Sequence, residues 1–148
     1  MLADLNAQRA VLGEPPWSGL LTIAALGRGC VRAVLQAMDG GQAPQRPALR
    51  TAVTHLLDLL AGRAPGRAVE VRIPPHAAIQ CIAGPTHTRG TPPNVVETDA
   101  QTWILLAVGR LSWAQAAAGG KLRASGARAD LSGYLPLAAA DAGPGQDH

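Results

Sequence analysis

The stretch that decides the fold is residues 99–137, DAQTWILLAVGRLSWAQAAAGGKLRASGARADLSGYLPL. Thr98 and Gln101 stand at its beginning with the spacing of a capping box, in which two side chains satisfy free backbone N–H groups at the start of a helix. The pattern predicts a helix from about Asp99 to Val108, which Gly109 ends.

The same device recurs at Ser112 and Gln115, which predicts a second helix that ends at Gly119-Gly120. Residues 121–124 then alternate polar and apolar, as a half-buried strand does. A turn at residues 125–126 follows, and a last short helix is expected to run toward Tyr134, before Pro136.

The segment before this stretch predicts a helix followed by strands. Pro47 suits the first position of a helix, and Gly62 suits its end. Between them, apolar residues follow helical spacing without a miss, at positions 49, 52, 53, 56, 57 and 60, and His55 points away from that apolar stripe. Three strands are then expected, at residues 69–73, 78–83 and 94–97, with the first two antiparallel and the second covered on both faces.

The N-terminal part is harder to interpret. Glu14-Pro15-Pro16 breaks any helix there, so residues 1–18 are expected to be mobile or a loosely docked arm, with Trp17 as its anchor. A helix with a polar face at Arg28, Arg32 and Gln36 follows and begins near Arg28 or before it. The chain is therefore divided into an N-terminal arm or extra helix (1–27), a domain (28–137) and a flexible tail (138–148).

Composition narrows the possible functions. The chain has 148 residues, a length typical of one domain, and a formal net charge of +3. Its 29 alanines and absence of phenylalanine predict a core of small aliphatic residues with tryptophan as the main aromatic. Twelve arginines and one lysine are spread along the chain without a basic run, which argues against nucleic-acid binding.

Several further classes are disfavoured by the sequence. The longest apolar stretch, residues 20–38, contains two arginines and does not suit an integral membrane segment. With no secretory signal pattern, Cys30 and Cys81 are expected to be free and buried, and the protein to be cytoplasmic.

The candidate chemistry is sparse. His76 and His87 lack metal-ligand spacing, and Cys81 lies within an apolar strand where a thiol stays protonated. No metal, no cofactor and no catalytic residue is therefore expected, and the protein is predicted not to be an enzyme. The loop around His87 and Arg89 could hold an anionic head group, but the favoured alternative is that Arg89 pairs with a nearby carboxylate and the loop only shapes a turn.

The order of these elements resembles a sterol-carrier-protein-type domain. The corresponding pieces are Gly109-Arg110-Leu111, Ala116 to Ala118, and the run GKLRASG at 120–126. The segment RAPGRAVEVRIPPHAAIQCIAGPTHTRGTPPNVVETDAQTW at 63–103 is similar to the single-domain actinobacterial branch of that family. The resemblance implies an α/β (α+β) fold with a mixed or antiparallel sheet of about five strands and helices packed mainly on one face.

The resemblance also implies a function, the non-catalytic binding of a small apolar ligand such as a fatty-acyl or sterol-like lipid. The ligand would occupy a cavity between sheet and helices, with His87 or Arg89 at its mouth. The alternative is a structural or partner-binding module, such as a homodimer, that keeps the fold but fills the cavity. The candidate lining residues are Trp103, Ile104, Leu106, Trp113, Ala116, Leu122 and Leu131.

Overall fold

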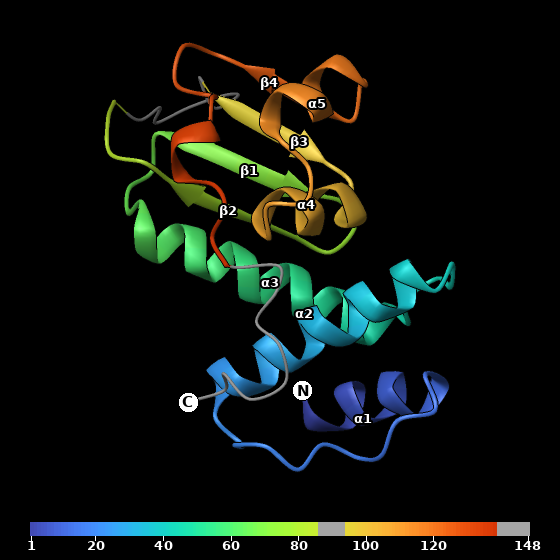
Figure 1. Ribbon diagram of the computed structural model, residues 1–148. Coiled ribbons are helices and arrows are strands. Elements are labelled where there is room, and N and C mark those ends of the chain that lie inside the picture. Colours follow the sequence, from blue (N-terminus) through green and yellow to red (C-terminus); the bar gives the residue numbers. More distant parts are fainter. Residues whose placement is uncertain (86–93, 139–148) are drawn as a thin grey trace. The chain divides into compact units, whose positions relative to one another are not determined.

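The structure is a computed structural model that describes residues 1–85 and 94–138. Its elements, drawn in Figure 1, combine helices with one mixed sheet, as expected for an α+β fold. In chain order they are α1 (Leu2–Val11), α2 (Ile23–Asp39), α3 (Arg46–Arg63), β1 (Val69–Ile73), β2 (Ala77–Cys81), β3 (Val95–Thr98), α4 (Ala100–Ala107), α5 (Trp113–Ala118), β4 (Leu122–Ser125) and the 3-10 helix η1 (Ser132–Tyr134).

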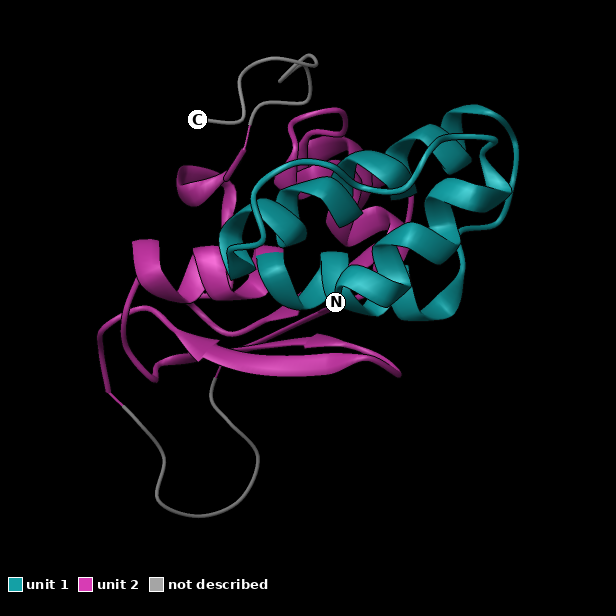
Figure 2. Cartoon of the chain, turned by 90° about the horizontal axis from the view of Figure 1, so that it is seen from below, with its two compact units in different colours: residues 1–55, 142–148 teal, residues 56–141 magenta. Residues whose placement is uncertain are grey.

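The chain divides into two compact units, coloured separately in Figure 2. Unit 1 comprises residues 1–55 together with 142–148, and unit 2 comprises residues 56–141. The boundary falls inside α3, so this one helix runs through both units. The boundary that the sequence suggested between residues 27 and 28 remains a prediction, although it cuts across α2.

In unit 1, the segment expected to be a mobile or loosely docked arm begins with a helix. Leu5 and Gln8 of α1 are fully buried. The Gln8 side-chain oxygen accepts a hydrogen bond from the Gln45 backbone N–H at 2.6 Å, which ties α1 to the beginning of α3. Trp17 is the anchor of the connection to α2, since its backbone N–H donates to Asn6 Oδ1 at 2.7 Å. The prolines after Val11 end α1 but do not prevent it.

Helix α2 begins five residues before Arg28, because Thr22 caps it and its Oγ1 accepts from the Ala25 N–H at 3.1 Å. Gly27 lies in this first part of α2, and its lack of a side chain allows His55 of α3 to approach closely. A β-carbon built on Gly27 would overlap the His55 ring. His55 is therefore half-buried, and the prediction that it points to the surface was wrong.

In unit 2 the sheet has the order β2-β1-β3-β4. The β1–β2 and β3–β4 pairs are antiparallel and the central β1–β3 pair is parallel, so the sheet is mixed. Val69, Val71 and Ile73 are buried while Glu70 and Arg72 are half-buried, as the strict alternation predicted. The expected antiparallel pairing of β1 and β2 is confirmed.

Two details of the sheet differ from expectation. The described residues form four strands, where about five were expected. Strand β2 is not covered on both faces, because Ala78 and Gln80 are exposed while Cys81 is buried. Strand β2 is a short edge strand, and its apolar composition comes largely from alanine. An alanine side chain can be exposed at little cost because its apolar surface is small.

The helix starts in unit 2 show which capping signals were reliable. The Ser112–Gln115 box is present at α5, with Ser112 Oγ accepting from the Gln115 N–H at 3.0 Å. At α4 the cap is Asp99, whose Oδ1 accepts from the Thr102 N–H at 2.9 Å. Thr98 belongs to β3 instead, and its hydroxyl donates to the Lys121 carbonyl at 2.7 Å. The predicted box at Thr98 was wrong because a carboxylate one residue later is the better-placed acceptor.

The segment after β4 is mostly irregular, and the expected last helix is the single turn η1. It is held by the Arg63 guanidinium, which donates to the carbonyls of Tyr134, Pro136 and Leu137 at 3.0, 2.7 and 3.3 Å. The Leu137 N–H in turn donates to the Ala107 carbonyl at 2.7 Å. The C-terminal ends of α3 and α4 thus hold this segment in place, although its described residues contain no regular element besides η1.

Candidate functional site

The helical parts of unit 2 lie on one side of its sheet, as Figure 2 shows. The expectation that helices pack mainly on one face of the sheet is confirmed. An apolar layer lies between the sheet and these helices. The residues proposed to line a cavity belong to that layer. Six of them are almost fully buried: Trp103 (1% exposed), Ile104 (0%), Leu106 (2%), Ala116 (0%), Leu122 (9%) and Leu131 (0%).

One apolar cluster unites residues from three elements. Leu106 of α4, Ala116 of α5 and Leu122 of β4 pack together. Trp113 is partly buried and packs against them. Thus four of the seven predicted lining residues meet in one place, because α4, α5 and β4 follow each other closely along the chain and fold back on one another.

Helix α5 is a thin cover for this cluster. It has six residues, WAQAAA, and Ala116 is its only buried residue. An alanine contributes little apolar surface, so the contact of α5 with the layer depends mainly on Ala116 and Trp113, while the Ser112–Gln115 cap stabilises the helix itself. The sequence analysis missed Leu111 and Leu135, which also pack against the cluster. Leu111 lies between α4 and α5 and Leu135 precedes Pro136, so no helical or strand periodicity includes them.

Two predicted site residues lie outside the described residues. His87 and Arg89, expected near a polar head group, belong to the segment 86–93. Their role therefore stays a prediction.

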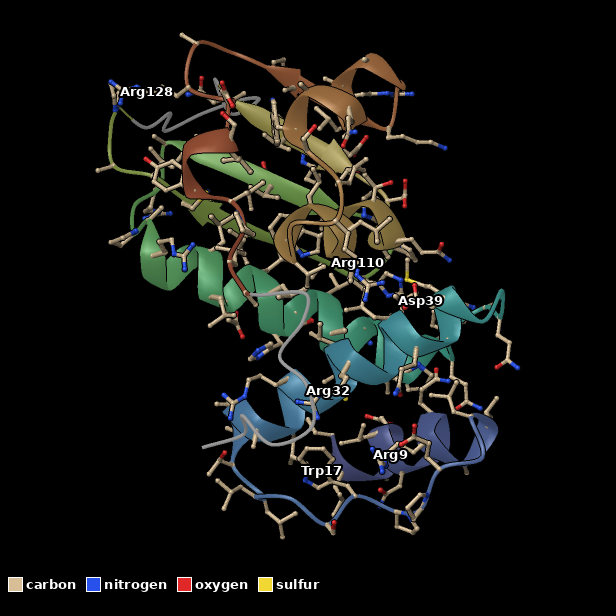
Figure 3. All side chains as sticks on the ribbon, viewed as in Figure 1. Arg9, Trp17, Arg32, Asp39, Arg110 and Arg128 are labelled. Carbon is tan, nitrogen blue, oxygen red and sulfur yellow. The ribbon has the colours of Figure 1, made fainter. Side chains whose placement is uncertain are left out.

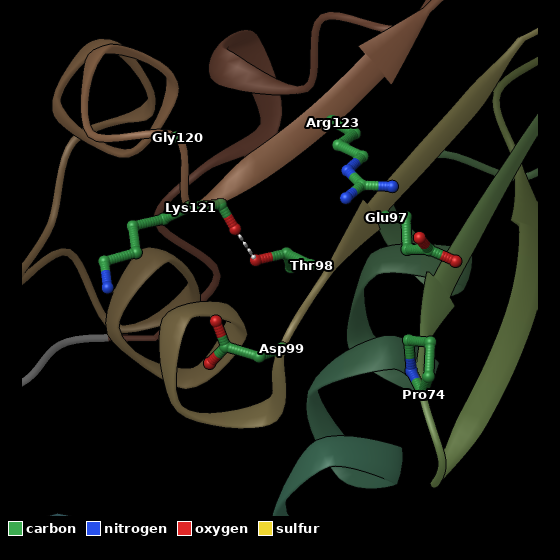
Figure 4. Close-up of a pocket in the computed structure, with 7 residues that line it drawn as sticks. All are labelled: Pro74, Glu97, Thr98, Asp99, Gly120, Lys121 and Arg123. Carbon is green, nitrogen blue, oxygen red and sulfur yellow. Dashed lines mark hydrogen bonds between the residues drawn. The ribbon is translucent and has the colours of Figure 1, made fainter.

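A polar groove of about 280 Å3 lies where α4 begins and α5 ends, as Figure 4 shows. Its volume is at the lower limit of a small-molecule pocket. Charged side chains dominate its lining, so it is chemically distinct from the apolar cluster. The groove is lined by Pro74, Glu97, Thr98, Asp99, Gly120, Lys121 and Arg123.

The groove's polar groups are partly committed to the fold. Besides its backbone contact, Asp99 accepts from the Thr102 hydroxyl at 2.7 Å, so its carboxylate serves as a helix cap. Glu97 and Arg123 are direct cross-strand neighbours in the β3–β4 register and have opposite charges. This arrangement suits structural pairing of charges better than acid–base catalysis. The sequence analysis did not single out this groove, and the only sequence signal at Lys121 and Arg123 is the polar–apolar alternation of β4.

The two thiols are poor nucleophiles. Burial raises the pKa of the Cys81 thiol to about 11, and burial together with the nearby Asp4 carboxylate raises the pKa of the Cys30 thiol to about 11. Both are free, as the sequence predicted. At neutral pH they stay protonated and are unsuited to covalent catalysis.

The buried polar residue Asn94 has a structural role. Asn94 is buried, its amide donates to the Ala68 carbonyl at 2.9 Å, and its side-chain oxygen accepts from the Arg128 N–H at 2.9 Å. It therefore joins the beginning of β1 to the segment after β4. Over residues 1–85 and 94–138, no three His, Cys, Asp or Glu side chains gather in a way that could hold a metal ion. In the same residues, no helix combines the length and apolarity that a membrane span needs.

The fold and the apolar layer define a class of protein. It is a small α+β domain in which helices cover one side of a mixed sheet and enclose a layer of apolar side chains. The comparisons with known proteins agree with that class. The family model described as "bacterial SCP ortholog" (SCP, sterol carrier protein) matches residues 45–137, and the chain belongs to this family. No curated protein matches the chain.

Proposed function

We propose that this protein is a non-catalytic carrier that binds a small apolar ligand, fatty-acyl or sterol-like, between the sheet and the α4–α5 pair. Membership of the SCP family supports the lipid-carrier class. The proposed lining is Trp103, Ile104, Leu106, Trp113, Ala116, Leu122 and Leu131.

The observation that carries the proposal is the thin cover over the Leu106–Ala116–Leu122 cluster. Helix α5 buries only Ala116, and Trp113 at its first position stays partly exposed beside the cluster. Few of the contacts of this six-residue helix, those of Ala116 and Trp113, would break if it moved outward, and the cluster beneath it would then be uncovered. A ligand that enters beneath α5 would replace that cover with its own apolar surface.

The driving force would be the removal of ligand surface from water. This contributes about 25 cal/mol per Å2 before the cost of association is subtracted. We propose that His87 or Arg89 meets a polar head group, which would orient an amphiphilic ligand.

The alternative function is a structural or partner-binding module with the same fold. The observation that favours it is the nearly complete burial of six of the proposed lining residues, which is also how a filled core looks. The two functions differ in one measurable respect, since only a carrier takes up a ligand at micromolar concentration.

The test is a titration with a fluorescent fatty acid, with Ala116→Trp and Ala117→Trp as a matched pair. Ala116 is fully buried and Ala117 is exposed on the same helix. We expect Ala116→Trp to weaken binding at least about tenfold by filling the space under α5, while Ala117→Trp leaves it unchanged. A melting curve of each variant separates loss of binding from loss of folding.

Native mass spectrometry of freshly purified protein provides a second measurement. A co-purified lipid would support the carrier. If wild-type protein binds no apolar ligand at micromolar concentration, the carrier function is excluded and the module takes its place.

A further inference from the structure

The most exposed large apolar side chains of the described residues lie together in unit 1. Leu20, Leu21 and Ile23 are 55%, 68% and 76% exposed. They stand within four consecutive positions, at the end of the connection between α1 and α2 and at the first turn of α2. A contiguous exposed apolar group of this kind marks an interaction site more often than scattered single residues do. We refer to residues 17–23 as the apolar loop.

The apolar loop is anchored to the fold at several points. The Trp17 indole N–H donates to the Leu20 carbonyl at 3.0 Å, and a β-carbon on Gly19 would overlap the Trp17 ring. The same ring reaches α2, where it would contact a β-carbon on Gly29. Figure 3 shows Trp17 beside Arg9, whose guanidinium lies 5.8 Å from the ring centroid. Since Thr22 caps α2, the loop displays its aliphatic side chains in a fixed conformation.

Basic residues outnumber acidic ones in the chain around the apolar loop, although Arg9 beside Trp17 is paired with Glu14 at 3.2 Å. Between Glu14 and Asp39 the chain has no carboxylate and two arginines, Arg28 and Arg32. Within residues 1–55 there are five arginines against three carboxylates. Such a distribution attracts an anionic surface and repels a cationic one.

We infer that the apolar loop is a docking element for an anionic lipid bilayer surface. Side chains as exposed as Leu21 and Ile23 project from the fold and do not line a groove, so their partner must accept a projection. A bilayer interface accepts an apolar projection of any shape, whereas a protein partner needs a complementary hollow. Trp17, the first residue of the loop, suits the level of the lipid head groups, where tryptophan is enriched.

This inference goes beyond the proposed function, because it concerns where the protein meets a lipid surface and not what it carries. Three aliphatic side chains and a modest positive charge bind a bilayer reversibly, which favours brief docking over permanent attachment. Because the site is in unit 1, its loss leaves the proposed ligand site in unit 2 intact.

The experiment is co-sedimentation of the full chain with vesicles of phosphatidylcholine alone or of phosphatidylcholine mixed with phosphatidylglycerol. The test variant is Leu21→Ser/Ile23→Ser, and the matched control is Val11→Ser, which removes another exposed aliphatic residue (52%) of unit 1. Val11 ends α1, at the opposite end of the α1–α2 connection, as the ribbon in Figure 1 shows. Serine at these exposed positions removes apolar surface without creating a buried polar group.

We expect wild type to bind the anionic vesicles, with binding reduced by salt, because salt screens exposed charges. We expect about a tenfold or greater loss of partitioning for Leu21→Ser/Ile23→Ser and little change for Val11→Ser. Binding of the fluorescent fatty acid should be equal in all three proteins, which separates this result from the carrier test.

Three outcomes would overturn the inference. Wild type that sediments with neither vesicle has no docking element. An equal loss in Val11→Ser would show that adsorption is not specific to the apolar loop. Sedimentation equilibrium that shows a wild-type dimer and a Leu21→Ser/Ile23→Ser monomer would assign the loop to a second copy of the chain.

Discussion

At the scale of single residues, Gly27 shows why a small side chain can matter more than helix propensity. Glycine in a helix costs about 1 kcal/mol relative to alanine. Here the space that a β-carbon would need is taken by the His55 ring of α3. The glycine therefore permits the α2–α3 contact inside unit 1.

We expect Gly27→Ala to destabilise the protein, because overpacking typically costs about 1–3 kcal/mol and exceeds the gain in propensity. Chemical denaturation should show the loss, and adding His55→Ala should remove it. Gly62→Ala is the control: nothing lies within 4 Å of a β-carbon there, so a gain of about 0.5–1 kcal/mol is expected. Equal effects at both glycines would contradict the contact.

The buried thiols predict a dependence of stability on pH. Folding raises the pKa of Cys30 and Cys81 from 9.0 to about 11, so between these values the unfolded chain loses thiol protons that the folded chain keeps. The folded state then binds more protons, and the free energy of unfolding falls as pH rises through this window. Stability from these groups is complete below pH 9.

Urea titrations at several pH values between 8 and 11 should show a smaller decline for Cys30→Ala/Cys81→Ala than for wild type. In native protein both thiols should react with a thiol reagent far more slowly than after denaturation. Identical pH slopes in the two proteins would refute the effect of burial on the pKa.

At the scale of elements, α3 carries fully buried and partly exposed leucines within four consecutive positions. Leu56 and Leu57 are fully buried, whereas Leu59 is 39% exposed. We expect Leu56→Ala or Leu57→Ala to cost about 2–5 kcal/mol in unfolding free energy, and Leu59→Ala about 0.5 kcal/mol or less. Thermal melts of the three variants check this. If Leu56→Ala and Leu57→Ala both melt at the wild-type temperature, α3 does not bury these two leucines.

The start of α4 supplies another test. Asp99→Ala should cost about 1 kcal/mol, because it leaves the Thr102 N–H and hydroxyl without their acceptor. Asp99→Asn keeps an acceptor oxygen and should recover most of that loss. If denaturation midpoints of the two variants coincide, the cap contributes nothing measurable.

Much of this element structure could be predicted from the sequence. Helix α3 and strand β1 follow strict periodicities, and Ser112–Gln115 formed its box, because these signals are local and strong. Thr98 and Asp99 are both suitable N-cap residues for α4, and their positions in the sequence do not show which of them caps the helix. For residues 1–27 the sequence left an arm and an extra helix open, because the anchor of α1, the Gln8–Gln45 hydrogen bond, joins residues that are 37 positions apart.

The candidate site was predictable only in part, for a related reason. The family resemblance pointed to Leu106 and Ala116, which lie on helices that the sequence predicts. Leu111 and Leu135 could not be found, because they lie outside any periodic segment and reach the cluster through the tertiary fold.

At the scale of the whole molecule, the two units share α3. A helix of 18 residues cannot lose half its length without weakening the rest, because helix formation is cooperative. We therefore expect one calorimetric transition for the whole chain. Gly27→Ala in unit 1 and Leu56→Ala in unit 2 should each shift that single transition, and two separate peaks in either variant would show that the units unfold independently.

The parallel pairing of β1 with β3 has a consequence during protein synthesis. A ribosome makes β2 before β3, so until β3 is made β1 has one partner and its other edge consists of unpaired backbone N–H and C=O groups. Bare strand edges attract other chains. Released chains that end between residues 82 and 94 should therefore associate with one another, whereas chains that extend past residue 125 can complete the sheet within one molecule.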